Sequence, residues 1–469
     1  MSDESGGPTT EQAVVWALAA EVPAGWKRID AAFALTVGTR AAAVGYSDGR
    51  QDLTVDPSES LLNLAAEHRR VSAASGGPWW RMLVTLTGSG KADVGYDYGE
   101  EPFPESQLLP PEAYLADLEQ FPRDRVPVWL GAYTAHGQRQ RRGARQAAAQ
   151  VRADRDEQVW AVLAENEFPP LPIVRARWAT ISAAFVAVGS EWGPRILSWG
   201  GIFEGAARSG STLATLPHGR AVLSGGVWNS PELDAVYNEN TPMPEFYAGA
   251  PGWVTDEVLN PRAAAGLLSF CYWWDAGRWY RGESPPAEGC AAAIPAIWTA
   301  AVVRDIVTGL VRESGGTADP AATTVLISAA ESGAVTRTAL DAVFGVEHDI
   351  DGAFHQYALA GLVSMRPEPM PAEQAISYVR DYITGRGLDT TGYPLAQLTA
   401  ERFSVGWMLY VPVPDGEMAI GRAVFYVADD GTLEHSTSSS LPATVIAEHE
   451  RAFAERYGPR EDGASSRAG

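Results

Sequence analysis

The stretch WWRMLVTLTGSGKADVGYDYGEEP, residues Trp79–Pro102, decides how the first part of the chain folds. Two strand-like runs, Trp79–Leu86 and Ala92–Tyr98, flank the turn Thr87-Gly88-Ser89-Gly90, which is typical of a β-hairpin. Helices are expected before and after it, at Thr10–Glu21, Ser58–Val71 and Pro111–Phe121, and strands at Trp26–Ile29, Phe33–Val37 and Ala41–Tyr46. This order predicts a small α+β domain over residues 1–136.

The hairpin belongs to a series of motifs that runs from Gly25 to Leu130. They are Gly25-Trp26, Trp80-Arg81-Met82-Leu83 with Gly90-Lys91, Tyr96-Asp97-Tyr98-Gly99-Glu100-Glu101-Pro102, Tyr114-Leu115 with Asp117-Leu118, Phe121-Pro122-Arg123, and Pro127 with Trp129-Leu130. In these motifs the first block resembles the YezG-like immunity family, whose members are small cytoplasmic proteins that neutralise secreted polymorphic toxins, nucleases among them. The resemblance implies that the chain binds a toxin.

At 469 residues the chain is longer than the roughly 250–300 residues that one core organises, so several domains are expected. Residues 137–168 carry an arginine island in an acidic chain, which favours a solvated helical joint. The arginines are Arg139, Arg141, Arg142, Arg145, Arg152 and Arg155. Residues 169–370 form a Trp-rich middle domain of unknown type, with small antiparallel strands first and a mostly helical second half. The expected strands are Arg195–Phe203 and Arg220–Trp228, and the expected helices are Arg262–Trp274, Ala296–Arg312, Ala321–Ser332, Thr336–Phe344 and Asp351–Ser364.

A second joint is expected at Arg366–Pro371, because each proline of this run disfavours helix in the residue before it. Residues 371–458 then predict a second α+β domain. Its expected elements are the helix Ala372–Thr384, the strands Gly406–Val413 and Ala423–Val427, the turn Asp429-Asp430-Gly431 and the helix Ala443–Tyr457. With Ala375–Tyr382, Tyr393-Pro394, Gly406-Trp407 and Val424–Gly431, this block resembles the YrhB-like immunity domains. Residues 459–469 are expected to be a disordered tail.

The composition narrows the classes of partner. A net charge of −22 repels phosphate backbones and anionic lipids, so neither nucleic acid nor a membrane is an expected partner. No apolar run approaches the ~20 residues of a membrane helix, and the acidic start Met1–Ser5 is unlike a signal peptide. Cys271 and Cys290 are too far apart in the sequence for a CxxC motif. These features predict a soluble cytoplasmic protein.

The sequence carries no complete motif for catalysis, for a cofactor or for a metal. Gly88-Ser89-Gly90-Lys91 lacks the earlier glycine of a phosphate loop and is better explained as a hairpin turn. His348, Asp349, Asp351 and His355 could hold a divalent metal. Two helical turns, about 10 Å, would separate the histidines, and either aspartate could instead cap a helix. We therefore expect no catalytic residues, no cofactor and no metal site.

The segment Val227–Asn240 concentrates amides, carboxylates and aromatic rings. Glu232 and Asp234 could act as an acid and base pair in an enzyme. Alternatively, Asn229 or Ser230 caps a helix that begins at Pro231. A protein-contact loop is the third interpretation.

These observations predict a non-catalytic protein-binding protein, an immunity protein or antitoxin that neutralises a basic secreted toxin domain. A scaffold of a larger assembly and an enzyme housed in the middle domain remain alternatives. The partner-binding residues are expected on an acidic and aromatic ridge of the first block and in the Val227–Asn240 segment. They are Trp79, Trp80, Asp97, Tyr98, Glu100, Glu101, Asn229, Glu232, Asp234, Tyr237 and Asn238. Trp79 and Trp80 should face opposite sides of their strand, so that only one points into any given core.

Overall fold

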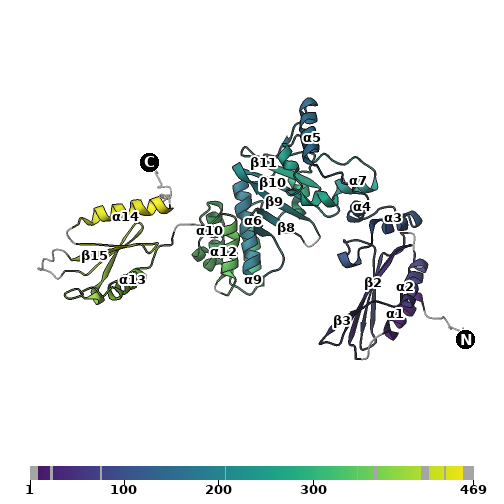
Figure 1. Cartoon of the computed structure of the whole chain (residues 1–469), viewed down its shortest axis with the longest axis horizontal. Coiled ribbons are helices and arrows are strands. Elements are labelled where there is room, and N and C mark those ends of the chain that lie inside the picture. The colour runs from purple at the N-terminus through teal and green to yellow at the C-terminus, as the bar shows by residue number, and fades with distance from the viewer. Residues whose placement is uncertain are drawn as a thin grey trace.

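The computed structural model describes residues 9–21, 25–73, 76–205, 208–345, 347–363, 367–413, 422–437 and 440–457. Within these ranges the strands form three antiparallel sheets, of five, seven and four strands, in chain order (Figure 1). Helices flank each sheet, which confirms the predicted multidomain α+β fold. No helix in the described part of the chain has both the length and the apolar character needed to cross a bilayer. Arg366 and the tail 459–469 lie outside the described residues.

The first sheet has the strand order β3-β2-β1-β4-β5. Its elements are α1 (Thr10–Ala20), β1 (Arg28–Leu35), β2 (Arg40–Ser47), β3 (Asp52–Val55), α2 (Glu59–Val71), β4 (Arg81–Thr87), β5 (Ala92–Asp97), η1 (Glu105–Gln107), α3 (Pro111–Gln120) and α4 (Val128–Ala135). The predicted hairpin is β4–β5, in which Leu86 pairs with Ala92. The two strands expected between Trp26 and Val37 are instead the single strand β1, which pairs along its length with both β2 and β4.

This sheet has an apolar core on each face. Trp79 packs with α1 and α2 on one face, and Trp80 packs with Phe103, Tyr114 and Trp129 on the other. The two neighbouring rings thus point to opposite sides, as strand alternation requires, and each is only 1% exposed. Assigning Trp79 and Trp80 to a partner-binding surface is therefore wrong, because helices cover both rings.

The carboxylate of Asp117, on α3, joins three other parts of the first domain. It accepts hydrogen bonds from the backbone N–H of Val37 at 3.0 Å and from Trp80 Nε1 at 3.0 Å. It also forms an ion pair with Arg69 of α2 at 2.7 Å, and both side chains are buried. Arg69 Nε in turn donates to the carbonyl of Trp79 at 2.7 Å. A buried charge pair of this kind is stable only while each member keeps its partners.

The middle sheet has the strand order β6-β12-β11-β10-β9-β8-β7. Its strands are β6 (Val162–Leu163), β7 (Arg195–Leu197), β8 (Gly200–Glu204), β9 (Gly210–Leu216), β10 (Arg220–Gly226), β11 (Phe270–Asp275) and β12 (Arg278–Arg281). The edge of β7 is covered by Gln356, whose Oε1 accepts from the backbone N–H of Ile196 at 2.7 Å. This contact protects an edge that could otherwise pair with another chain.

Helices cover one face of the middle sheet, with α6 and α12 packed against it and α9 and α10 beyond (Figure 1). The helices of this region are α5 (Ala144–Asp156), α6 (Leu171–Ala187), α7 (Pro231–Asn238), α8 (Ala287–Cys290), α9 (Ala300–Glu313), α10 (Pro320–Glu331), α11 (Arg337–Phe344) and α12 (Ile350–Leu359), with short 3-10 turns η2 (Pro217–Gly219), η3 (Gly252–Thr255), η4 (Pro261–Ala265) and η5 (Ala291–Ala293). The helix expected at Arg262–Trp274 is wrong. Only η4 is helical there, and the aromatic run Phe270–Asp275 forms the buried strand β11, where large flat side chains pack well.

The arginine-rich segment 137–168 contains the expected helix α5, on which Arg145, Arg152 and Arg155 are exposed, and its first part also packs against the middle domain. Gln140 is buried, donating to the carbonyl of Leu268 at 2.7 Å and accepting from its N–H at 3.0 Å. Arg141 pairs with Glu257 and Arg142 with Glu245. Strand β6 then pairs with β12, so the middle sheet begins before residue 169.

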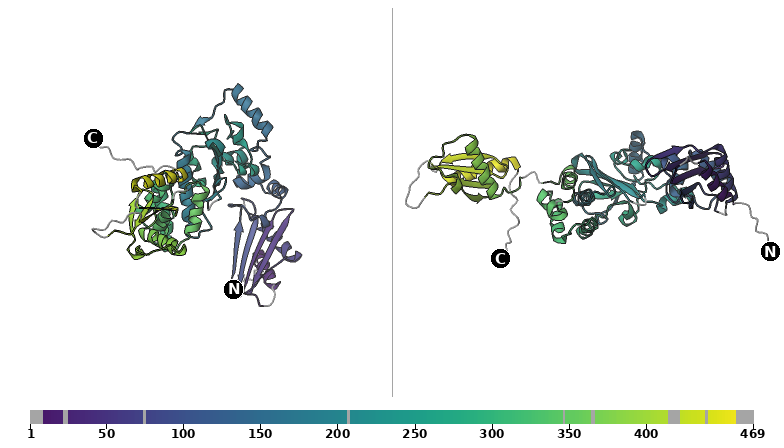
Figure 2. Two further views of the ribbon diagram at one scale, coloured as in Figure 1. Left: turned by 60° about the vertical axis from the view of Figure 1, so that its left-hand side comes forward. Right: turned by 90° about the horizontal axis from the view of Figure 1, so that it is seen from below.

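The third sheet has the order β13-β14-β15-β16 and lies apart from the other two (Figure 2). Its elements are α13 (Ala372–Gly385), η6 (Leu395–Gln397), β13 (Thr399–Phe403), β14 (Gly406–Tyr410), β15 (Ala423–Ala428), β16 (Leu433–Thr437) and α14 (Pro442–Tyr457). Helix α13 covers the main core, and Phe453 of α14 packs with Val405 and Ala428. The two expected strands and two expected helices are present, and β13 and β16 are additional.

Replacing Asp117 should destabilise the first domain more than any comparable surface change. Asp117→Asn leaves Arg69 buried without a counter-charge, so we expect a loss of about 3–5 kcal/mol in the free energy of unfolding. Asp124→Asn is the control, since Asp124 is exposed. Urea unfolding, followed by pulse hydrogen–deuterium labelling of α2 and β4 peptides, measures the effect. A loss below about 1 kcal/mol would mean that Asp117 does not hold the domain together.

Candidate functional site

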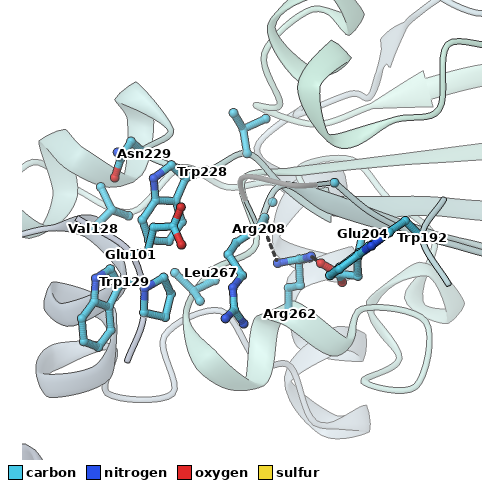
Figure 3. Close-up of a pocket in the computed structure, with 14 residues that line it drawn as sticks. Glu101, Val128, Trp129, Trp192, Glu204, Arg208, Trp228, Asn229, Arg262 and Leu267 are labelled. Atoms are coloured by element: carbon cyan, nitrogen blue, oxygen red, sulfur yellow. Dashed lines mark hydrogen bonds and ion pairs between the residues drawn. The ribbon is translucent and has the colours of Figure 1, made fainter. Parts of the chain in front are cut away.

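A cleft of about 780 Å³ lies where the first and middle domains meet (Figure 3). Residues of the loop before η1 and of α4 form the first-domain wall, namely Glu101, Pro102, Val128 and Trp129. The middle domain forms the other wall, with Trp192, Glu204, Arg208, Trp228, Asn229 and Arg262 among its residues. Its volume falls within the roughly 300–1,000 Å³ typical of ligand sites, which often lie between domains.

Helix α4 fixes the two walls relative to each other, because it belongs to both apolar cores. Val128 packs in the core of the middle domain with Val222 and Leu233, whereas Trp129 and Leu130 pack in the aromatic core of the first domain. The domains therefore share a helix and not merely a linker.

Helix α7 strengthens this junction. Ser230 caps it by accepting from the N–H of Leu233, and Pro231 occupies the first turn, as one of the sequence alternatives predicted. Asp234 pairs with Arg125, and Asn238 makes two hydrogen bonds to the backbone of Val126, at 2.8 and 3.0 Å.

Close packing of Tyr237 completes the junction. A Cβ on Gly131 of α4 would lie only 2.8 Å from the Tyr237 Cβ, so glycine permits this approach. Tyr237 Oη also donates to the carbonyl of Gly266 at 2.8 Å. The contacts at this junction thus involve Asp234, Tyr237 and Asn238. Their predicted place on a partner-binding surface is corrected, because they bind other parts of the same chain.

The first-domain wall ends in an exposed acidic loop. Gly99 has a φ of 86°, and its carbonyl accepts from Trp129 Nε1 at 2.7 Å. Beyond it, Glu100 and Glu101 are exposed, and Tyr98 is 40% exposed. We name residues 98–101 the acidic loop. Its position follows from Trp129, which anchors it to the aromatic core.

The residue before this loop is held within the domain. Asp97 forms a partly buried ion pair with Arg81 and accepts from the N–H of Gly99 at 2.8 Å. Arg123 stacks over Trp80 with its guanidinium 3.6 Å from the ring, and burial lowers the pKa of Arg123 to about 10. The negative charges of Asp117 and Glu100 act against this lowering of the Arg123 pKa. Asp97 is therefore part of the support of the loop and not of its free surface.

The middle-domain wall carries two arginines in different states. Arg262 Nη2 contacts both carboxylate oxygens of Glu204 at 2.7 Å, so these two charges neutralise each other. Arg208 has a φ of 61°, unusual for a residue with a side chain, and is exposed. Asn229, also on the cleft, has a φ of 53°. Two strained backbone positions therefore lie at one site.

The structure brings together some of the expected binding residues and separates others. Glu101 and Asn229 both line the cleft, although they are far apart in the sequence. Glu232 is half-buried and accepts from Ser230 Oγ at 2.6 Å. Sequence reasoning missed Trp192, Arg208 and Glu204. No motif marks them, and only the exposed Trp192 in a turn hints at a surface role.

The histidine and aspartate group at the start of α12 is dispersed. Asp349 caps the helix by accepting from the N–H of Gly352 at 2.8 Å, as the alternative prediction had it. Asp351 pairs with Arg337, and His348 Nε2 lies 2.8 Å from Ser314 Oγ. In the described ranges, no three His, Cys, Asp or Glu side chains are grouped so as to hold a metal ion.

A second polar network is buried beside α1. Thr10 Oγ1 lies 2.9 Å from His68 Nδ1, His68 Nε2 lies 2.8 Å from Tyr96 Oη, and Tyr96 donates to the Glu11 carboxylate. The rings of Trp79 and Tyr96 pack against the imidazole. Burial lowers the pKa of His68, although the charge of Glu11 acts in the opposite direction. The imidazole is therefore a neutral structural group.

Comparison with known proteins does not identify the chain. A scan against protein-family models gives no match, and a search of curated proteins gives none either. The interpretation of the cleft rests on its geometry and charge.

The buried His68 predicts that the first domain loses stability in mild acid. Because its pKa is lowered on folding, the unfolded chain binds a proton below pH 6.5 while the folded chain does not. Stability is complete above pH 6.5 and falls below it, by no more than about 1.4 kcal/mol per pH unit. Urea unfolding of α2 and β4 at pH 7.5 and 5.5, labelled at one fixed pH, measures this.

The variants separate His68 from other titrating groups. His68→Gln should reduce the difference between the two pH values, whereas His355→Gln, at an exposed position, should leave it unchanged. An equal pH response in wild type and His68→Gln would contradict the assignment.

Proposed function

We propose that this chain is a non-catalytic protein-binding protein that neutralises a toxin, and that the acidic loop is the first point of contact with a basic partner. The observation that carries the proposal is the exposure of Tyr98, Glu100 and Glu101 on one loop, of which Glu101 lines the cleft. An acidic group beside an exposed aromatic ring suits capture of a basic protein, because tyrosine contributes to binding energy and carboxylates attract cationic surfaces.

The hydrogen bonds that hold the acidic loop in place support the same proposal. Trp129 holds the carbonyl of Gly99, and Asp97 holds its N–H, so the backbone is fixed before a partner arrives. A preorganised loop loses little conformational entropy on binding. The net charge of −22 adds a long-range attraction for basic proteins.

The toxin-neutralising part of the proposal draws on the resemblance of the first block to the YezG-like immunity family. Two of the motifs that carry this resemblance meet here: the Tyr98–Glu101 segment forms the acidic loop, and Trp129 anchors it. The same motif series thus supplies both the scaffold and the exposed carboxylates.

The partner can be isolated by cross-linking in native host cells and then expressed in a heterologous cell. The partner alone should arrest growth, and co-expression of the chain should restore it. A partner that is harmless on its own would contradict toxin neutralisation.

Reversing the charges of the acidic loop should slow association with that partner. We expect Glu100→Lys/Glu101→Lys to lower the association rate about tenfold at low ionic strength, and less at high salt, because screening weakens exposed charges. Stopped-flow or biosensor kinetics measures the rate. The control, Glu313→Lys/Glu448→Lys, changes the net charge equally at exposed sites outside the first domain. Equal slowing by both double variants would attribute the effect to net charge alone and remove the acidic loop from the interface.

A further inference from the structure

The cleft carries one uncompensated charge on each wall. Within the described residues, neither Glu101 nor Arg208 has a side-chain ion pair or hydrogen bond, whereas Arg262 and Glu204 neutralise each other. Figure 3 shows Glu101 on one side of the cleft and the Arg208 side chain toward its middle. The two charges have opposite sign and belong to different domains.

Backbone hydrogen bonds of the flanking residues hold Arg208 in position. The N–H of Gly205 donates to the carbonyl of Ser209 at 2.7 Å, and the N–H of Arg208 donates to the carbonyl of Gly205 at 3.2 Å. Ser209 Oγ accepts from the N–H of Trp228 at 2.8 Å, which ties the turn to the neighbouring strand end. The left-handed backbone of Arg208 costs free energy that glycine would avoid, yet an arginine stands there.

Aromatic surface accompanies these charges. Trp192 is 74% exposed at the rim, and Trp228 is half-buried opposite the first-domain wall. Large exposed aromatic rings are typical of surfaces that bind peptide segments. The cleft therefore offers two rings, one cation and one anion to a single occupant.

We propose that the cleft receives a protruding segment of the protein partner that carries both a basic and an acidic side chain. The basic side chain pairs with Glu101 and the acidic one with Arg208, and the segment lies against Trp192 and Trp228. This inference rests on the proposed protein-binding function and specifies its partner.

Charge complementarity favours this occupant over segments with charge of one sign. A purely anionic segment would meet Glu101 and the negative field of the whole chain. A purely basic segment would leave Arg208 facing another cation, and like charges in contact oppose binding. A segment with both charges satisfies both walls and bridges the two domains.

Synthetic octapeptides, acetylated and amidated so that their ends carry no charge, test the proposal on the full-length chain. One set holds a lysine and a glutamate one to four residues apart, in either order, around a tyrosine. The other sets hold only lysines, only glutamates, or neither. Fluorescence anisotropy should show binding by mixed-charge peptides at least tenfold tighter than by the other sets. Equal binding of single-sign peptides, or no binding by any set, would overturn the inference.

Three variants assign the binding to the cleft. Glu101→Lys and Arg208→Gly should each weaken the mixed-charge peptides at least tenfold, and the glycine keeps the turn because it accepts a positive φ. The double variant Glu101→Lys/Arg208→Glu exchanges the charges of the walls and should again bind a mixed-charge peptide, with the residue order reversed. Arg155→Glu, at an exposed position of α5, is the control. Unchanged binding by both single variants would place the peptides elsewhere and overturn the inference.

The isolated partner separates this inference from the proposed function. Arg208→Gly should lower the affinity of the partner about tenfold. A partner that binds Arg208→Gly as tightly as wild type overturns the cleft assignment and leaves toxin neutralisation standing. A chain that neutralises no toxin, yet binds mixed-charge peptides in an Arg208-dependent way, overturns toxin neutralisation and leaves the cleft assignment standing.

Discussion

The buried carboxylate of Asp117 ties α3 to α2, to the β1–β2 turn and to Trp80 at once. Three donors, one of which is a charged guanidinium, satisfy the two carboxylate oxygens. Without such partners, burying the carboxylate would be costly. Because Trp80 is held there, its ring forms one wall of the aromatic core that also contains Phe103 and Trp129. Trp129 then fixes the carbonyl of Gly99 and hence the acidic loop. A charge pair deep in the domain thus determines the placement of exposed carboxylates on its rim.

Helix α4 extends this dependence across the domain boundary. One of its faces belongs to the aromatic core and another to the core of the middle domain, so moving either domain would expose Val128 or Trp129. Arg125 and Asn238 add polar contacts along the same seam. A cleft with two such walls keeps its width, which makes recognition of a pair of charges possible. A flexible junction would let Glu101 and Arg208 pair with each other or drift apart.

The sequence predicts most local elements of the fold but little of the site. The β4–β5 hairpin, the Ser230 and Asp349 caps and the α13 helix follow from turn and capping chemistry that acts within a few residues. The β11 strand was mistaken for a helix because its aromatic run is compatible with either, and pairing with β10 and β12 decides it. Alternation correctly placed Trp79 and Trp80 on opposite faces but could not reveal that each face has its own core. The sequence predicted a binding role for Glu101 and Asn229 but not for Arg208. The place of Arg208 on the cleft depends on contacts between distant parts of the chain, which no sequence motif marks.

The distribution of charge explains why Arg208 matters despite standing in an acidic protein. With 58 acidic and 36 basic side chains, an arginine has many possible partners, and Arg69, Arg81, Arg142 and Arg262 all lie against carboxylates. Arg142 and Arg262 are bound to acids of their own domain, which leaves their charge locally neutral. Among the described residues Arg208 has no such partner, because Arg262 takes the carboxylate of Glu204. On the proposed function, the excess of acid would steer a basic partner toward the chain over long range, and Arg208 would discriminate among partners at contact, since only a segment with a suitably placed carboxylate can satisfy it.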